Sequence, residues 1–217
     1  MQNIALIGVG KFGYYFARSI KDKVNELVVI DNDEKKINQV KSFISNSIIA
    51  DATNREVLEQ LDLKSMDAVV ISMGEKIESS ILTTLYLQEM GITNITVKAN
   101  SEDHAKILLK TGAAHTVFPE RESAFRLAYS ISELNVLNHI DIAEGYSIIE
   151  MAPPSSFEGK SIRELDIRKK YGVTILIVKQ IVPEKTIVPT PDFIIKQSDI
   201  LVIMGKNEDL KKISEIK

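Results

Sequence analysis

Short apolar runs alternate with helical patterns over the first half of the chain. Six runs rich in Ile, Val and Ala are typical of buried strands, and amphipathic stretches with apolar residues at i, i+3 and i+4 separate them. The predicted strands are Ile4–Ile7, Leu27–Ile30, Ser47–Ala50, Ala68–Ile71, Ile95–Val97 and His115–Phe118. Such repeats favour parallel pairing through right-handed crossovers. We therefore predict an α/β fold with a Rossmann, doubly wound parallel sheet in the order 3-2-1-4-5-6.

Polar residues and glycines mark the ends of the predicted helices. Asp33 and Ser101 precede two helical patterns, and Thr53-Asn54-Arg55-Glu56 predicts a capping box that opens a third. Gly91 and Gly112 follow the last apolar positions of two others, where glycine commonly ends a helix.

The pattern changes after Pro119. Residues from Arg121 to about Leu134 predict an amphipathic helix, and no strand pattern follows it directly. Its apolar stripe consists of Ala124, Leu127, Ala128, Ile131 and Leu134. Such a helix packs either on its own domain or on another subunit or domain, and the sequence leaves both open.

From about residue 140 the sequence predicts a smaller α+β domain, so we divide the chain into residues 1–139 and 140–217. Apolar runs at Tyr146–Met151, Val173–Val178 and Ile200–Met204 predict strands. A capping box at Ser161 opens a short helix that ends near Gly172.

Two features complete the second domain. Three of the six prolines lie between Pro183 and Pro191, which predicts a loop and an edge strand. Asn207 is placed to cap a charged C-terminal helix.

The first predicted strand leads directly into the turn Gly8-Val9-Gly10-Lys11-Phe12-Gly13. In a G-x-G-x-x-G motif between a strand and a helix, the glycines allow a tight turn, approach of a pyrophosphate and close helix packing. Asp31 closes the next strand, where an acid can accept hydrogen bonds from ribose; the alternative, a helix cap, is already filled by Asp33. The combination predicts a nucleotide site.

Other polar residues follow strands at the same edge of the sheet. Asn32 adjoins Asp31, Asp51-Ala52-Thr53 follows the third strand beside the adenine side, and Ser72-Met73-Gly74 follows the fourth. Thr53 is also explained as a helix cap. Lys11 and Lys98 would add positive charge near phosphates, which favours ATP or ADP; each is equally a solvated surface charge.

Composition excludes several classes of site. The 217 residues carry a net charge of −3, which does not indicate a broad nucleic-acid-binding face. The absence of cysteine excludes disulfides, thiolate metal sites and cysteine nucleophiles, and three histidines do not favour a His-rich metal site. No apolar run approaches the ~20 residues of a membrane helix.

Catalytic groups are scarce. None of His104, His115 and His139 has an obvious Asp, Lys or Tyr partner in a cleft, and residues 140–217 show no catalytic cluster. We therefore expect a protein that is not an enzyme, with an NAD(H)-dependent oxidoreductase or a soluble NAD(H) redox sensor as the alternatives. Glu120 lies at the same sheet edge, where an acid repels a nucleotide phosphate unless a cation intervenes or the phosphate belongs to another molecule. It is also fully explained as an acid in the first turn of a helix.

As a set, these residues resemble the RCK (regulator of K+ conductance) family, and within it the KtrA/TrkA-type cytosolic regulatory subunits of potassium uptake. The resemblance covers essentially the whole chain. The motifs that carry it are Ile7–Gly13, Val29–Asp31, Ala50–Thr53, Leu82–Leu85, Val97–Ala99, Phe118–Glu120, Asn135–Leu137, Lys170–Ile175 and Asp199–Gly205. The family usually has Arg at the position of Lys11, so the bidentate fork of a guanidinium is missing here.

The resemblance implies an RCK_N domain that binds ATP and ADP, or NAD(H) in some relatives, within an octameric ring of dimers. A membrane pore subunit of the KtrB/TrkH type would read the shape of the ring, which places the protein in the cytoplasm at the inner face of the membrane. Carried over, Gly8, Gly10, Lys11, Gly13 and Lys98 hold phosphates, Asp31 the ribose and Asp51 the adenine side. Glu120 would bind a divalent cation, Mg²⁺ or Ca²⁺, at the γ-phosphate of a neighbouring subunit.

The second domain resembles RCK_C, which in KtrA-like relatives binds cyclic di-AMP at its dimer interface. The residues implied are Ile162, Arg168, Ile175 and Pro191. A group of basic residues lies nearby, at Lys160, Arg163, Arg168, Lys169 and Lys170; it is also explained as a solvated helix face.

Overall fold

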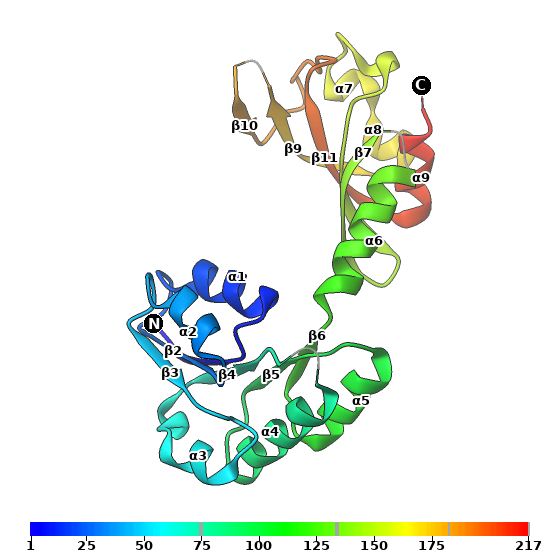
Figure 1. Ribbon diagram of the computed structural model, residues 1–217. Helices are drawn as coiled ribbons and strands as arrows, with labels where there is room; N and C mark the ends of the chain where they lie inside the picture. Colours follow the sequence, from blue (N-terminus) through cyan, green and yellow to red (C-terminus); the bar gives the residue numbers. More distant parts are fainter. Residues whose placement is uncertain (74–75, 133–134, 182, 217) are drawn as a thin grey trace. The chain divides into compact units, whose positions relative to one another are not determined.

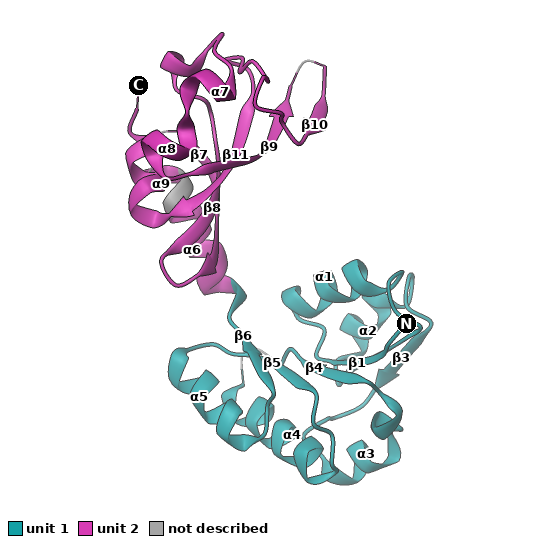
Figure 2. Ribbon diagram, turned by 180° about the vertical axis from the view of Figure 1, so that it is seen from behind, with its two compact units in different colours: residues 1–119 teal, residues 120–217 magenta. Residues whose placement is uncertain are grey.

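The computed structural model describes residues 1–73, 76–132, 135–181 and 183–216 of the chain. They form two compact units, residues 1–119 and residues 120–217 (Figure 2). No helix in these ranges is long and apolar enough to cross a membrane.

The first unit is built on a parallel sheet in the order β3-β2-β1-β4-β5-β6, as predicted (Figure 1). Its strands are β1 (Asn3–Ile7), β2 (Glu26–Asp31), β3 (Asn46–Ile49), β4 (Ala68–Ile71), β5 (Ile95–Lys98) and β6 (His115–Val117). Its helices are α1 (Lys11–Ile20), α2 (Glu34–Val40), α3 (Arg55–Gln60), the 3₁₀ turn η1 (Leu63–Ser65), α4 (Ile77–Glu89) and α5 (Glu102–Thr111).

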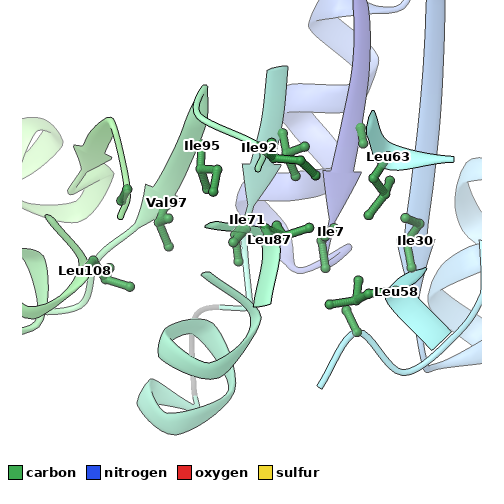
Figure 3. Packing of buried hydrophobic residues seen from close by; sticks show 14 of the residues in the cluster. Ile7, Ile30, Leu58, Leu63, Ile71, Leu87, Ile92, Ile95, Val97 and Leu108 are labelled. Carbon is green, nitrogen blue, oxygen red and sulfur yellow. The ribbon is translucent and has the colours of Figure 1, made fainter. Parts of the chain in front are cut away.

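Two apolar clusters cover the two faces of this sheet. On one face, α1 and α2 pack Ala17 and Ile37 against Leu6 and Val29. On the other face, α3, α4 and α5 contribute apolar side chains to the cluster shown in Figure 3. The labelled members are Ile7, Ile30, Leu58, Leu63, Ile71, Leu87, Ile92, Ile95, Val97 and Leu108. Burial on both faces explains why the central strands β1, β2 and β4 are apolar runs rather than alternating patterns.

The second unit contains an antiparallel sheet in the order β10-β9-β11-β8-β7. Its elements are α6 (Pro119–Ser132), β7 (Val136–Ala143), β8 (Tyr146–Met151), the 3₁₀ turn η2 (Ser155–Phe157), α7 (Ile162–Leu165), α8 (Ile167–Tyr171), β9 (Thr174–Gln180), β10 (Lys185–Ile187), β11 (Ile200–Lys206) and α9 (Asn207–Ser214). Residues from β8, β9, β11, α8 and α9 form its core. The proline-rich segment supplies the edge strand β10, as predicted.

The α6–β7 region differs from the expectation. A strand does follow α6, because β7 pairs with β8 and Val136 joins the second core. The structure accordingly divides the chain after residue 119, whereas the sequence placed the boundary between residues 139 and 140. On α6, Leu127 is 60% exposed and Ile131 73%, so the described residues do not cover the predicted stripe. Leu134 lies outside the described residues.

The helix caps are partly as predicted. Asp33, Ser101 and Ser161 cap α2, α5 and α7, and Gly112 ends α5 with a φ of 120°. The capping box at Thr53 is wrong: the cap of α3 is Asn54, whose side-chain Oδ1 accepts hydrogen bonds from the amides of Glu56 and Val57.

Two expectations for the second unit also need correction. Asn207 is not the cap of α9 but its first residue, since the N-cap is Lys206, and the Asn207 side chain accepts a hydrogen bond from the Ser147 hydroxyl 2.8 Å away. The single helix predicted between Ser161 and Gly172 is two short helices, because Asp166 adopts a left-handed conformation with a φ of 45°.

A buried histidine joins α4 to α5. His104 is buried, with only 2% of its surface exposed to solvent. Its Nδ1 accepts a hydrogen bond from the Asn100 amide, and its Nε2 lies 3.0 Å from the Ser80 hydroxyl, which itself donates to the Ile77 carbonyl. These contacts select the neutral tautomer with the proton on Nε2. Burial lowers the pKa of His104.

We predict that His104 makes the protein less stable in mild acid. Below about pH 6.5 the unfolded chain takes up a proton at this histidine that the folded chain resists, so the free energy of unfolding falls as the pH falls. Chemical denaturation at several pH values between 7.5 and 5.5 measures the slope of the free energy of unfolding against pH. His104→Gln should flatten it, whereas His115→Gln, at an exposed histidine, should not. Equal slopes for the wild type and His104→Gln would contradict this assignment.

Candidate functional site

The glycine loop, residues Gly8–Gly13, joins β1 to the start of α1. Each of its three glycines has a different reason to be glycine. Gly8 has a φ of 99°, and a Cβ there would lie 2.6 Å from the carbonyl oxygen of Ser72. A Cβ on Gly13 would overlap with the carbonyl oxygen of Gly8. Gly8 is therefore needed for the turn and Gly13 for the close packing of α1 on β1.

Gly10 is not required by the fold in this way. Its φ of −75° is open to any residue, and a Cβ would have only the Ser72 carbonyl oxygen near it, 3.9 Å away. Gly10 is the N-cap of α1, so the amides of the first helical turn follow it. A glycine without a steric reason at this point is consistent with a ligand that approaches the backbone closely.

Asp31 fixes the glycine loop from the end of β2. Its carboxylate is 93% buried and accepts hydrogen bonds from the amide of Val9 at 2.7 Å and the amide of Asp33 at 2.9 Å. The ammonium of Lys36 lies 3.9 Å from the same carboxylate. Each oxygen accepts one backbone N–H and keeps a second lone pair, so the geometry leaves capacity for a hydroxyl donor. Asn32, the next residue, is exposed.

The loop after β3 is held by hydrogen bonds within the segment Asp51–Asn54. The Asp51 carboxylate accepts from the amide of Thr53 at 2.9 Å and from its hydroxyl at 2.7 Å. These bonds, the hydroxyl bond first, lower the pKa of Asp51. Thr53 thus braces the Asp51 side chain rather than capping α3. Ala52 between them is buried.

The loop after β4 begins with Ser72, whose amide donates to the Ile7 carbonyl at 2.7 Å. Met73 is half-buried, and Gly74 lies outside the described residues. Thr83 on α4 contacts both this loop and the loop after β3, through the Met73 sulfur and the Ala52 carbonyl oxygen. Sequence reasoning assigned Thr83 no role; adjacent threonines inside a helix, where their propensity is poor, were the available signal.

The remaining predicted residues of the first unit occupy different environments. Lys11 is exposed at the first position of α1. The ring of Phe12 stacks on Phe16 with centroids 6.1 Å apart, so its side chain belongs to the packing of α1. Lys98 is half-buried at the end of β5.

Topology brings these groups to one edge. The strand order reverses between β1 and β4, and ligands of open parallel sheets bind outside the carboxyl ends of the strands at such a point. The loops after β1, β2, β3, β4 and β5 all leave from that edge.

Glu120 belongs to the second unit, where it is exposed in the first turn of α6. An acid at this position is favoured by the helix dipole. Within the part of the chain that the structure describes, no group of three or more His, Cys, Asp or Glu side chains is placed to hold a metal ion.

The predicted second-unit residues come from four segments: Ile162 begins α7, Arg168 lies in α8, Ile175 in β9 and Pro191 in the loop after β10. Ile162 and Ile175 are half-buried and pack against the core of that unit, whereas Arg168 and Pro191 are exposed. The amide of Arg163 donates to the Pro191 carbonyl at 2.7 Å. The start of α7 is therefore joined by backbone to the 191–193 segment.

One of the nearby basic residues already has an acidic partner. The guanidinium of Arg163 binds both carboxylate oxygens of Asp192, with nitrogen–oxygen distances of 2.9 and 3.3 Å. The pair raises the pKa of Arg163 and lowers that of Asp192, through the hydrogen bond first and the charge second.

Comparison with known proteins agrees with this architecture. The TrkA-N domain model matches residues 4–119, and the TrkA-C domain model matches residues 146–217. The Ktr system potassium uptake protein C of Bacillus subtilis is 37% identical over 99% of this chain and 96% of its own length. The Ktr system potassium uptake protein A of the same organism is 37% identical over 97% of this chain and 95% of its own.

Solved structures of the GsuK channel share the fold. One covers 99% of this chain with a TM-score of 0.73 at 19% identity, and another, bound to NAD, covers 99% with a TM-score of 0.54 at 21% identity. This chain spans only 39% and 38% of those longer chains.

The relatives also bear on the type of protein. The two Bacillus proteins are potassium uptake proteins by name rather than enzymes, which confirms the expectation that this protein is not an enzyme. The matched domain models and the near-complete alignment at 37% identity show that the chain belongs to the RCK (TrkA-N/TrkA-C) family, among its KtrA/TrkA-type potassium-uptake proteins.

Proposed function

We propose that this protein is a nucleotide-sensing regulatory subunit that gates a membrane potassium channel or transporter of the KtrB/TrkH type. ATP and ADP would bind at the glycine loop, in an octameric ring of dimers on the cytoplasmic face of the membrane. The potassium-uptake relatives support the partner class, and the NAD-bound GsuK structure supports a dinucleotide or adenine nucleotide as the ligand class.

The observation that carries the proposal is the space at Gly10. Gly8 and Gly13 are explained by the protein itself, whereas Gly10 sits at the start of α1 with an unstrained φ and no close neighbour for a Cβ. A phosphate would use this space, because the first amides of the helix and its dipole both favour an anion there.

The charges around the loop support a ligand with several phosphates. Lys11 directly follows Gly10, and an exposed ammonium at that position adds a positive charge beyond the backbone amides. We place Asp31 and Asn32 at the ribose, the segment Asp51–Thr53 at the adenine side, and the Met73-Gly74 turn and Lys98 beside the phosphates.

Gating requires the nucleotide to distinguish two conformations. A ligand that binds both equally shifts neither, whatever its affinity. We propose that the number of phosphates supplies the difference. Glu120 would act only when a γ-phosphate from a neighbouring subunit and a divalent cation, Mg²⁺ or Ca²⁺, complete the site, because the carboxylate alone repels phosphate.

We predict that Gly10→Ala separates nucleotide binding from folding. The substitution should change the free energy of unfolding by less than about 1 kcal/mol, since the poorer helix cap and the reduced entropy of the unfolded chain have opposite signs. ATP, ADP and NADH should each lose at least about tenfold in affinity, because the methyl group occupies the pyrophosphate position. Isothermal titration calorimetry and thermal unfolding measure the two effects.

The matched control is Gly13→Ala, which should destabilise the fold itself because its Cβ overlaps with the Gly8 carbonyl oxygen. Unchanged nucleotide affinity in a folded Gly10→Ala protein would place the ligand elsewhere.

We predict that Glu120→Gln removes the divalent-cation-dependent part of the stabilisation by ATP. In the wild type, Mg²⁺ or Ca²⁺ should raise the unfolding temperature of the ATP complex further than that of the ADP complex. The control is Glu122→Gln, in the same first turn of α6, which should keep this increment. Light scattering should show a dimer or a larger ring, because the cation lies between subunits. A monomer, or an unchanged increment in Glu120→Gln, would refute the cation assignment.

We further propose that cyclic di-AMP binds the second unit at Ile162, Arg168, Ile175 and Pro191. Arg168→Ala should abolish this binding, since it removes the exposed guanidinium that we place at a phosphate. Lys169→Ala, its exposed neighbour on α8, should retain it. Calorimetric titration with cyclic di-AMP decides, and full binding by Arg168→Ala would exclude that residue from the site.

A further inference from the structure

Helix α4 carries three buried hydroxyl groups. Ser80 is 2% exposed, and Thr83 and Thr84 are fully buried. A buried hydroxyl is costly unless it is hydrogen-bonded, and neither Ser nor Thr is a strong helix former. The partners of these three groups therefore show what each contributes.

Two of the three hydroxyls bond within α4 or towards α5. Thr84 donates to the Ser80 carbonyl oxygen 2.6 Å away, one turn earlier in the same helix. Ser80 donates to the Ile77 carbonyl and meets His104 of α5. Thr84 is thus satisfied by its own helix, a common arrangement for threonine.

Thr83 differs because its hydroxyl reaches two loops outside α4. Its Oγ1 lies 3.0 Å from the carbonyl oxygen of Ala52, in the loop after β3. It also lies 3.5 Å from the sulfur of Met73, in the loop after β4. A hydroxyl has one proton, and the carbonyl oxygen is the stronger and nearer acceptor, so Ala52 receives the principal bond.

We propose that Thr83 is a positioning residue for the nucleotide site. Its hydroxyl fixes the loop that carries Asp51 and Thr53 relative to α4 and to the Met73 turn. This inference rests on the proposed function, in which those two loops flank the adenine and phosphate parts of the ligand.

The other bonds of the Asp51–Asn54 segment do not perform this task. The Asp51–Thr53 bonds and the Asn54 cap keep the shape of the loop and start α3, but both act within neighbouring residues. The Thr83 bond joins residues 31 positions apart and satisfies a carbonyl of the buried Ala52. Without it, that carbonyl loses the Thr83 donor and the loop loses this hydrogen-bonded attachment to α4.

The adjacent threonine offers a matched experiment. Thr83→Val and Thr84→Val remove the same hydroxyl, from neighbouring and equally buried sites, at almost constant volume. The affinities of both full-length variants for ATP and for ADP are measured by calorimetry below their unfolding temperatures. Thr83→Val should weaken both nucleotides by about 3- to 10-fold, the effect of one net hydrogen bond. Thr84→Val should stay within about twofold of the wild type.

Two further readouts separate positioning from general destabilisation. The ratio of ATP to ADP affinity should be unchanged in Thr83→Val, because the displaced loop lies at the adenine end. Thr83→Ser, which keeps the hydroxyl, should restore the affinity. If Thr83→Val does not fold, Thr83→Cys is measured in its place. The thiol is a weaker donor than the hydroxyl, so the affinity for both nucleotides should fall below that of Thr83→Ser.

Equal affinities in Thr83→Val and Thr84→Val, while the wild type binds both nucleotides, would overturn this inference and leave the proposed function intact. A loss in Thr83→Val that Thr83→Ser does not restore would also overturn it. A wild type that binds neither nucleotide would overturn the proposed function, and the inference with it.

Discussion

The close contact between α1 and the start of the glycine loop is the constraint on which the nucleotide edge depends. With no Cβ on Gly13, the first turn of α1 approaches the Gly8 carbonyl, and with no Cβ on Gly8, the start of the loop approaches Ser72, directly after β4. The N-terminus of the helix is therefore held between β1 and β4, where the strand order reverses. Any side chain larger than hydrogen at these two positions would move the helix amides away from that point.

Asp31 converts this steric arrangement into a defined loop conformation. Its buried carboxylate accepts the amide of Val9 from the loop and the amide of Asp33 from the start of α2. Bonds from charged acceptors to backbone N–H groups are among the stronger hydrogen bonds in proteins. The same carboxylate that the sequence assigns to ribose recognition thus organises the loop, which accounts for its burial without any ligand.

Two kinds of element could be predicted from the sequence: strands that are buried on both faces, and turns that are fixed by a local motif. The central strands β1, β2 and β4 are apolar runs because helices cover both faces, and the glycine motif fixes where the first helix begins. Strand β7 was missed because it is an edge strand whose apolar residues are interrupted by Asn138, His139 and Asp141. Its existence depends on pairing with β8, which no local pattern reveals.

The errors in capping have a related cause. Thr53 and Asn54 are both good caps, and only the tertiary structure decides that Thr53 bonds Asp51 while Asn54 opens α3. The side chain of Asn207 likewise accepts a hydrogen bond from Ser147, which lies 60 residues earlier in the chain. The adjacent threonines of α4 were a signal, but the partner of Thr83 could not be predicted, since it is the backbone carbonyl of Ala52, which has no sequence signature.

The charged groups of the proposed site divide into fixed and adjustable ones. Asp31 is buried and held by two backbone amides, so its position is set by the fold. Lys11 is exposed at the first position of α1, and it follows Gly10, the one glycine of the Gly8–Gly13 loop that the fold does not require. A fixed carboxylate suits the ribose, which every adenine nucleotide shares. A mobile ammonium suits the phosphates, which differ between ATP and ADP in number and charge. In the proposed site, the rigid Asp31 therefore binds the ribose that all these ligands share. The adaptable Lys11 contacts the phosphates, whose number differs between ATP and ADP.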